Sequence, residues 1–171
     1  MVILIAGASH AGKTVLAQKL VEKLHYSCLS IDHLKMGLIR SGNTNLTVYD
    51  DDALTDYLWP IVREMVKTAI ENHQNLIVEG CYIPFDWQKD FRPEYLEQIE
   101  YRCLVMTPVY IRNHFDQIQQ HASDVEHRLD DSDLDPEWLI RENMRNLEQC
   151  RQHGHPVILF EDVYDMEKLA L

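Results

Sequence analysis

Short apolar runs alternate with longer segments of helical periodicity along the whole chain. The runs are brief, continuous and rich in Val, Ile and Leu, and they cover residues 2–6, 26–31, 76–78, 101–106 and 157–160. Continuous runs of this length are typical of strands that are buried on both faces of a parallel sheet. The intervening patterns predict helices over residues 13–25, 33–41, 53–73, 86–98, 109–121 and 136–152. Strands that alternate with helices predict a doubly wound α/β sheet of about five strands.

Local chemistry marks the ends of some predicted helices. Asp135 and Pro136 are residue types preferred at a helix N-cap and in the first turn, and Gly154 stands where that helix should end. Pro60 falls inside the pattern 53–73, so either the helix kinks there or two helices meet. The polar stretch 120–134 contains no apolar run, which predicts an exposed excursion from the sheet.

Composition narrows the functional classes. The chain has 171 residues, which suits one domain over residues 1–171. It is 46% hydrophobic and 26% charged, as ordinary soluble globular proteins are, and its formal net charge is -12. Because nucleic acid and anionic membranes both bind basic faces, this charge argues against partners of either kind.

The four cysteines indicate a reducing compartment. Cys28, Cys81, Cys103 and Cys150 form no CxxC pair and no short metal-binding spacing. In a chain of this length they do not indicate a disulfide framework. The apolar start, residues 1–6, is too short for a signal peptide or a membrane span. We therefore expect a soluble cytoplasmic protein.

The most specific motif follows the first apolar run. Residues 7–14 fit the pattern G-x-x-x-x-G-K-[ST] at every fixed position, between a predicted strand and a predicted helix. Such a loop turns successive backbone N–H groups toward a phosphate at the positive end of a helix. We therefore expect nucleotide binding by Gly7, Ala8, Ser9, His10, Ala11, Gly12, Lys13 and Thr14.

Three side chains of this loop raise separate expectations. Lys13 would reach the β- and γ-phosphates, and the Thr14 hydroxyl would coordinate Mg²⁺. The alternative for the motif is a glycine turn that carries a surface lysine. His10 stands at a variable position, where it either adds a donor near the phosphates or faces solvent.

Two carboxylates follow predicted strands. Asp32 comes after the run 26–31, and Glu79 after the run 76–78. Ligands of open α/β sheets bind outside the carboxyl ends of the strands, so both acids should face the crevice above the phosphate loop. We assign Asp32 as the proton acceptor and Glu79 as a Mg²⁺ ligand beside the acceptor, although either acid could be the base. The alternatives are a helix N-cap for Asp32 and a solvated turn acid for Glu79.

The order of these features resembles the P-loop small-molecule kinases, which include adenylate kinase-like enzymes, gluconate and shikimate kinases, chloramphenicol phosphotransferase and zeta-toxin-like kinases. The layout is similar over the whole chain, but only residues 7–14 form a specific motif. Ser30-Ile-Asp32 is similar to the segment that carries the base in the zeta-toxin and chloramphenicol groups. Val78-Glu79-Gly80 is similar to a hydrophobic-acid-glycine segment of such kinases. The insert of true adenylate kinases that binds a nucleoside monophosphate, with its arginines, is not evident.

The resemblance implies a three-layer P-loop NTPase fold with strand order 2-3-1-4-5, ATP as phosphoryl donor, and a lid after the fourth strand. The lid would cover residues of about 120–135 and contain Arg128. Since phosphoryl transfer needs positive charge beyond the loop lysine and Mg²⁺, we expect Arg128, and next Arg112, to contact ATP. Arg141 and Arg145 share a helix face and are further candidates. The alternative for each arginine is a surface ion pair.

The phosphoryl acceptor should lie beside the two acids. Lys35 and Arg40 either hold an anionic acceptor or are solvated helix charges. Tyr82 lies in an aromatic turn after Glu79 that forms either a pocket wall or part of the core. The acidic run 50–52 indicates a capping, solvated turn rather than a metal cluster.

These features together predict a phosphotransferase that uses ATP and Mg²⁺ and phosphorylates a hydroxyl or phosphate of a small molecule. The alternative is a nucleotide-binding regulatory ATPase without a small-molecule acceptor. The acceptor's identity stays open, as does the choice between a monomer and a homodimer.

Overall fold

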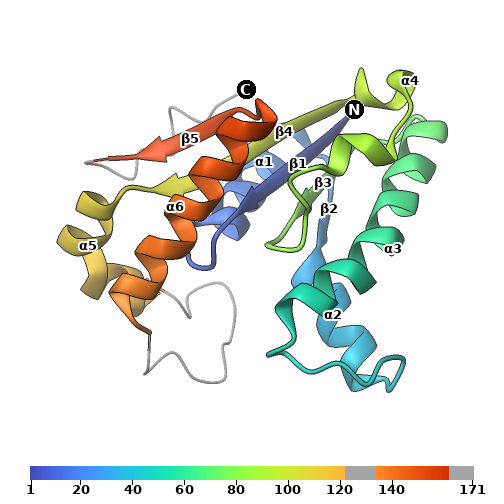
Figure 1. Cartoon of the computed structure of the whole chain (residues 1–171). Helices are drawn as coiled ribbons and strands as arrows, with labels where there is room; N and C mark the ends of the chain where they lie inside the picture. Colours follow the sequence, from blue (N-terminus) through green and yellow to red (C-terminus); the bar gives the residue numbers. More distant parts are fainter. Residues whose placement is uncertain (122–133, 162–171) are drawn as a thin grey trace.

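A parallel sheet of five strands forms the centre of the molecule (Figure 1). The computed structural model describes residues 1–121 and 134–161. The strands are β1 (Val2–Gly7), β2 (Ser27–Ser30), β3 (Leu76–Glu79), β4 (Ile99–Met106) and β5 (Val157–Phe160). They lie in the order β2-β3-β1-β4-β5, and every neighbouring pair is parallel. The predicted fold class and strand order are confirmed.

Helices connect the strands, and most begin and end within two residues of the predicted positions. The helices are α1 (Lys13–Leu24), α2 (Ile31–Arg40), α3 (Asp51–Glu71), the 3₁₀ helix η1 (Trp87–Asp90), α4 (Pro93–Leu96), α5 (Pro108–His121) and α6 (Pro136–His153). α3 is a single helix that contains Pro60, so the possibility that two helices meet there is wrong.

The predicted helix over residues 86–98 is also wrong. η1 ends at Asp90, the backbone is extended at Phe91 and Arg92, and α4 begins only at Pro93. A proline has no N–H to donate and pushes the residue before it out of the helical region. Pro93 therefore begins a helix here instead of lying inside one.

Alternate residues of β1 enter two hydrophobic cores. Val2, Leu4 and Ala6 pack with α3 on one face of the sheet, whereas Ile3 and Ile5 pack with α1 on the other. All five are buried, which explains why β1 is a continuous apolar run in the sequence. α5 joins the core on the α1 side, and α6 contributes to both cores. The result is the expected three layers of helix, sheet and helix (Figure 1).

The ends of α6 match the residues that predicted them. The Asp135 carboxylate accepts hydrogen bonds from the backbone N–H groups of Glu137 at 3.0 Å and Trp138 at 3.1 Å. Gly154 ends the helix in a left-handed conformation with φ 68°. An N-cap carboxylate and a left-handed glycine are common ways to satisfy the free backbone groups at helix ends.

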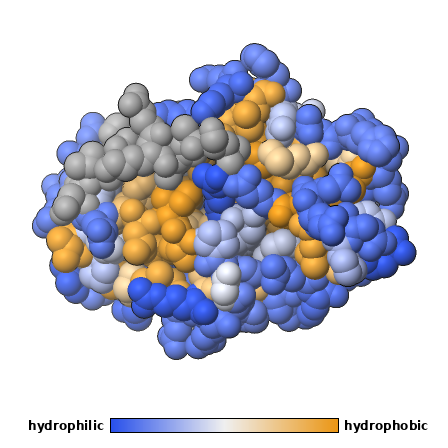
Figure 2. Space-filling view, turned by 90° about the horizontal axis from the view of Figure 1, so that it is seen from above, coloured by the Kyte–Doolittle hydropathy of each residue, from blue (hydrophilic) through white to orange (hydrophobic). Residues whose placement is uncertain are grey.

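The surface seen in Figure 2 is mostly hydrophilic, with hydrophobic residues in separate patches between polar ones. This agrees with the large number of charged side chains. Within the described ranges, no helix is both long and apolar enough to cross a membrane.

Candidate active site

Three neighbouring strands bring the phosphate loop and both predicted acids to one edge of the sheet. Ile5 of β1 and Ser30 of β2 each pair with Glu79 of β3, so these strands end side by side. The phosphate loop follows β1, and Asp32 is the second residue of α2, directly after β2. Both acids therefore lie at the edge where ligands of such sheets bind.

The backbone of the loop is shaped for an anion. His10 and Gly12 have left-handed φ values of 62° and 83°, and this conformation helps turn successive N–H groups toward one side. These N–H groups lie at the N-terminal end of α1, which is the positive end of the helix dipole. A Cβ atom at Gly7 would lie 2.6 Å from the carbonyl oxygen of Leu104, so only glycine allows the loop to start this close to β4. The His10 residue is half-buried.

Lys13 belongs to this loop and is buried, with only 6% of its surface exposed. Its Nζ donates a hydrogen bond to the carbonyl oxygen of Ala8 at 2.8 Å. Burial alone would lower the pKa of this lysine, but its electrostatic interactions with neighbouring side chains raise it, and the net shift is upward. The groups responsible are Cys81, Glu79 and Asp32. Lys13 is therefore positively charged at neutral pH, and its three N–H donors suit phosphate oxygens.

Thr14 and Glu79 form a pair of oxygen donors beside the loop. The Thr14 hydroxyl donates to Oε2 of Glu79 at 3.3 Å, and Glu79 is buried. Mg²⁺ prefers oxygen ligands and, in nucleotide sites, combines one or two protein ligands with phosphate and water oxygens. The pair therefore fits a magnesium site. Among the described side chains, those of residues 1–120 and 134–161, no three His, Cys, Asp or Glu lie together as an alternative metal site.

A chain of hydrogen bonds connects four side chains next to Asp32. Nζ of Lys35 donates to Oδ1 of Asp32 at 2.5 Å and to the Tyr82 hydroxyl oxygen at 3.0 Å. The Tyr82 hydroxyl in turn donates to Oδ1 of Asp51 at 3.1 Å. Burial, together with the nearby carboxylates, raises the pKa of Tyr82, which therefore stays a neutral donor. These contacts join α2, the turn after β3 and the start of α3.

The start of α2 excludes one of the two alternatives for Asp32, the helix N-cap. α2 begins at Ile31, two residues before the predicted position, and the fully buried Ile31 packs in the core beside the sheet. Ser30 consequently takes the N-cap position, and Asp32 lies in the first turn. The alternative that Asp32 is the N-cap is wrong, and its carboxylate bonds to Lys35 instead.

Comparison with known families identifies the chain. Residues 2–109 match the family described as AAA domain. The match covers more than half of the chain and includes the phosphate loop, Asp32 and Glu79. The chain belongs to this AAA domain family. No curated protein matches its sequence.

Solved kinases share the fold of this AAA domain. Deoxyadenosine kinase from M. mycoides has a TM-score of 0.58 at 15% identity, over 98% of this chain and 94% of that chain. A gluconokinase from Sinorhizobium meliloti 1021 has a TM-score of 0.51 at 12% identity, over 97% and 85%. Shikimate kinase from Bacteroides thetaiotaomicron has a TM-score of 0.53 at 14% identity, over 98% and 93%. These likenesses show the fold, and with the family match they confirm the predicted resemblance to P-loop small-molecule kinases.

The predicted arginines of this AAA domain lie on its surface where they are described. Nη2 of Arg112 is 3.2 Å from Oε1 of Glu137, and Nη2 of Arg141 is 3.7 Å from Oδ2 of Asp135. All four side chains are more than half exposed, and ion pairs of this kind contribute little to stability. Arg128 and most of the predicted lid lie outside the described residues.

Two neighbours of the site are missing from the sequence prediction. The acidic run 50–52 predicts only a solvated turn, yet Asp51 accepts the hydrogen bond of Tyr82. No sequence signal links the two, because they are 31 residues apart. Cys81 is exposed and helps to raise the pKa of Lys13. Its position two residues after Glu79 is a signal that would have placed it at the same edge of the sheet.

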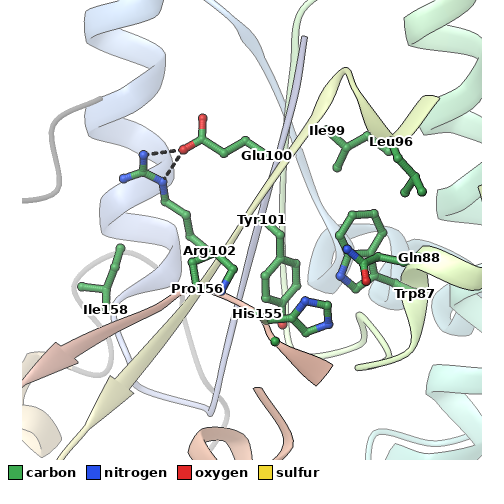
Figure 3. Close-up of a pocket in the computed structure, with 11 residues that line it drawn as sticks. Trp87, Gln88, Leu96, Ile99, Glu100, Tyr101, Arg102, His155, Pro156 and Ile158 are labelled. Carbon is green, nitrogen blue, oxygen red and sulfur yellow. Dashed lines mark hydrogen bonds and ion pairs between the residues drawn. The ribbon is translucent and has the colours of Figure 1, made fainter. Parts of the chain in front are cut away.

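A pocket of about 460 Å³ lies at the other end of the sheet (Figure 3). Its lining includes Trp87, Ile99, Tyr101, Arg102 and His155. Ile99 pairs with Val2 at the start of β1, whereas the phosphate loop follows the end of β1. Figure 3 shows Tyr101 beside His155, with ring centres 4.6 Å apart, and Arg102 paired with Glu100. The pocket is therefore separate from the phosphate-binding edge.

Proposed function

We propose that this AAA domain transfers the γ-phosphoryl group of Mg·ATP to a hydroxyl or phosphate of a small molecule. The observation that carries the proposal is the meeting of a phosphate loop, the Thr14–Glu79 oxygen pair and the Asp32 carboxylate at one edge of the sheet. Phosphoryl transfer needs donors for the phosphates, ligands for Mg²⁺ and a proton acceptor. Kinases with this fold, among them one solved with bound dATP, support the proposal.

The roles of the residues follow from their chemistry. The loop N–H groups and Lys13 hold the β- and γ-phosphates, and Thr14 and Glu79 would hold Mg²⁺, which neutralises phosphate charge when bound. Asp32 takes the proton of the acceptor hydroxyl while the acceptor oxygen bonds to the γ-phosphorus. The bond from the γ-phosphorus to the β–γ bridging oxygen breaks, and ADP leaves.

Further cations and acceptor groups complete the proposal. Arg128, in a lid over residues of about 120–135, and Arg112 supply positive charge to the migrating phosphoryl group. The acceptor binds beside Asp32, near Lys35 and Tyr82, while Arg40 is the exposed last residue of α2. All these parts belong to one proposed domain, residues 1–171.

Two variants test this function. Lys13→Ala should abolish both nucleotide binding and transfer, because it removes the charge that holds the phosphates. Asp32→Asn should keep nucleotide binding and lower the transfer rate by about 10²–10⁴-fold, the usual contribution of a general base. Nucleotide binding is measured by titration calorimetry, and transfer by ADP release together with the mass of the acceptor product, over a panel of sugars, nucleosides and nucleotides.

Matched controls separate these roles from general damage. Lys19→Ala removes an exposed lysine of α1, and Asp56→Asn an exposed acid of α3, so both variants should behave as the wild type does. Full transfer by Asp32→Asn would show that another group is the base. ATP hydrolysis that tracks the binding of a partner protein, with no product from any acceptor, would favour the regulatory ATPase instead.

A further inference from the structure

Lys35 is already engaged by the protein on the acceptor side. A lysine ammonium has three N–H donors and no acceptor. Two contacts are made, at 2.5 Å to Oδ1 of Asp32 and at 3.0 Å to the Tyr82 hydroxyl. The same ammonium lies 4.9 Å from the centre of the Tyr82 ring. Its positive charge is therefore directed at these groups and is not freely available to a ligand.

Exposure separates the acids from the cation in this cluster. The Lys35 side chain is 13% exposed, whereas the Asp32 side chain is 24% exposed. Asp51 is also exposed, while Tyr82, which bonds to it, is buried. A molecule that approaches this side from solvent therefore meets carboxylate more readily than ammonium.

Most charged side chains in the chain segments around this cluster are acidic. Apart from Lys35, Arg40 is the only Lys or Arg in segments 31–52 and 79–86. It lies eight residues after Asp32 in α2, about 12 Å along the helix axis. The acids of these segments are Asp32, Asp50, Asp51, Asp52, Glu79 and Asp86. An anionic acceptor would be repelled here unless it displaced Asp32 from Lys35.

We propose that the acceptor is a hydroxyl compound without negative charge, such as a polyol, a nucleoside or an amino sugar. The inference rests on the proposed function and selects its hydroxyl acceptor over its phosphate acceptor. Lys35 then acts as a positioning residue that holds the Asp32 carboxylate, and Asp51 contributes to selection against anions. This differs from one of the two alternatives that the sequence leaves open for Lys35 and Arg40, the binding of an anionic acceptor.

Matched pairs of acceptors test the inference with the full chain. Glucose and glucosamine are compared with gluconate and glucose 6-phosphate, and adenosine with adenosine 5′-monophosphate. Transfer from radiolabelled ATP gives kcat/KM for each compound. We expect kcat/KM to be at least tenfold higher for the members without negative charge.

Variants at Asp51 test the origin of this preference. Asp51→Lys should reduce the preference at least tenfold, through KM rather than kcat, and Asp51→Asn should have an intermediate effect. Asp56→Lys introduces the same charge at an exposed position farther along α3, so it should leave the preference unchanged. Thermal unfolding shows whether each variant is folded.

The outcomes distinguish the inference from the proposed function. Higher kcat/KM for the anionic members would overturn the inference and leave the kinase function standing. If nucleotide binds but no compound of either class is phosphorylated, the proposed function fails and the inference fails with it. A preference that Asp51→Lys and Asp56→Lys change equally would overturn the role of Asp51.

Discussion

Gly80 and Gly37 are two glycines near Asp32 where an added methyl group should have opposite effects on stability. A Cβ atom at Gly80 would lie 2.8 Å from Cβ of Ile31, whereas one at Gly37 would meet nothing within 4 Å. Gly80→Ala should lower the free energy of unfolding by about 1–3 kcal/mol, the usual cost of overpacking a core. Gly37→Ala should raise it by about 0.5–1 kcal/mol, since Gly37 lies inside α2 and alanine favours a helix.

Urea unfolding of both variants measures these changes. Since Ile31 directly precedes Asp32, Gly80→Ala should also move the start of α2 and slow phosphoryl transfer, while Gly37→Ala should not. An unchanged unfolding midpoint for Gly80→Ala would show that Ile31 moves aside without cost, so that the close contact does not fix the position of Asp32.

At the scale of single residues, the sequence alone does not predict which side chains contact one another. The motif over residues 7–14 predicts where the phosphate loop lies because its spacing reflects one local backbone shape. The bond from Tyr82 to Asp51 has no such local cause, because it depends on how α3 packs against the turn after β3. The role of Lys35 is likewise visible only once its contact with Asp32 is known.

The capped start of α6 allows a prediction for a whole element. Asp135→Ala removes the acceptor for two backbone N–H groups, so it should lower the free energy of unfolding by about 1 kcal/mol. Asp135→Asn keeps a capping oxygen and loses only the charge, and it should retain most of the stability. Urea unfolding measures both. Equal losses for the two variants would assign the effect to the carboxylate charge, which lies near the helix N-terminus and beside Arg141, rather than to the capping oxygen.

Strands were easier to predict than one of the helices, for a physical reason. The central strands β1, β3 and β4 are mostly buried between two cores, so their apolar runs survive in the sequence whatever connects them. Residues 86–98 mislead because Trp87, Phe91 and Tyr95 recur at helical spacing and are all buried. They reach the core as an aromatic cluster, with ring centres 5.9 Å apart for Trp87–Phe91 and 6.4 Å for Phe91–Tyr95. Periodicity alone does not distinguish such a cluster from a helix face.

The whole molecule combines a strongly acidic composition with a site for a polyanion. Its formal net charge of -12 repels nucleic acid and free nucleotide alike at long range. The loop N–H groups and the buried Lys13 reverse that sign locally, where low solvent exposure strengthens their effect. A ligand must therefore fit the loop to benefit, since a polyanion that contacts only the surface meets net repulsion.

Thermal unfolding of the full chain distinguishes a ligand that binds in the phosphate loop from a polyanion that contacts only the surface. A ligand that binds only the folded state at 100 times its Kd adds about 2.7 kcal/mol to stability. For a chain of this size, that corresponds to a rise in Tm of about 5–11 °C. Mg·ATP should produce this rise in the wild type and in Lys19→Ala but not in Lys13→Ala, and EDTA should reduce it if Thr14 and Glu79 hold Mg²⁺. Single-stranded DNA at the same phosphate concentration should leave Tm unchanged. An equal rise with DNA would mean that the phosphates are held by surface charge and not by the loop. A rise that persists in Lys13→Ala would mean that the charge of Lys13 is not needed to hold them.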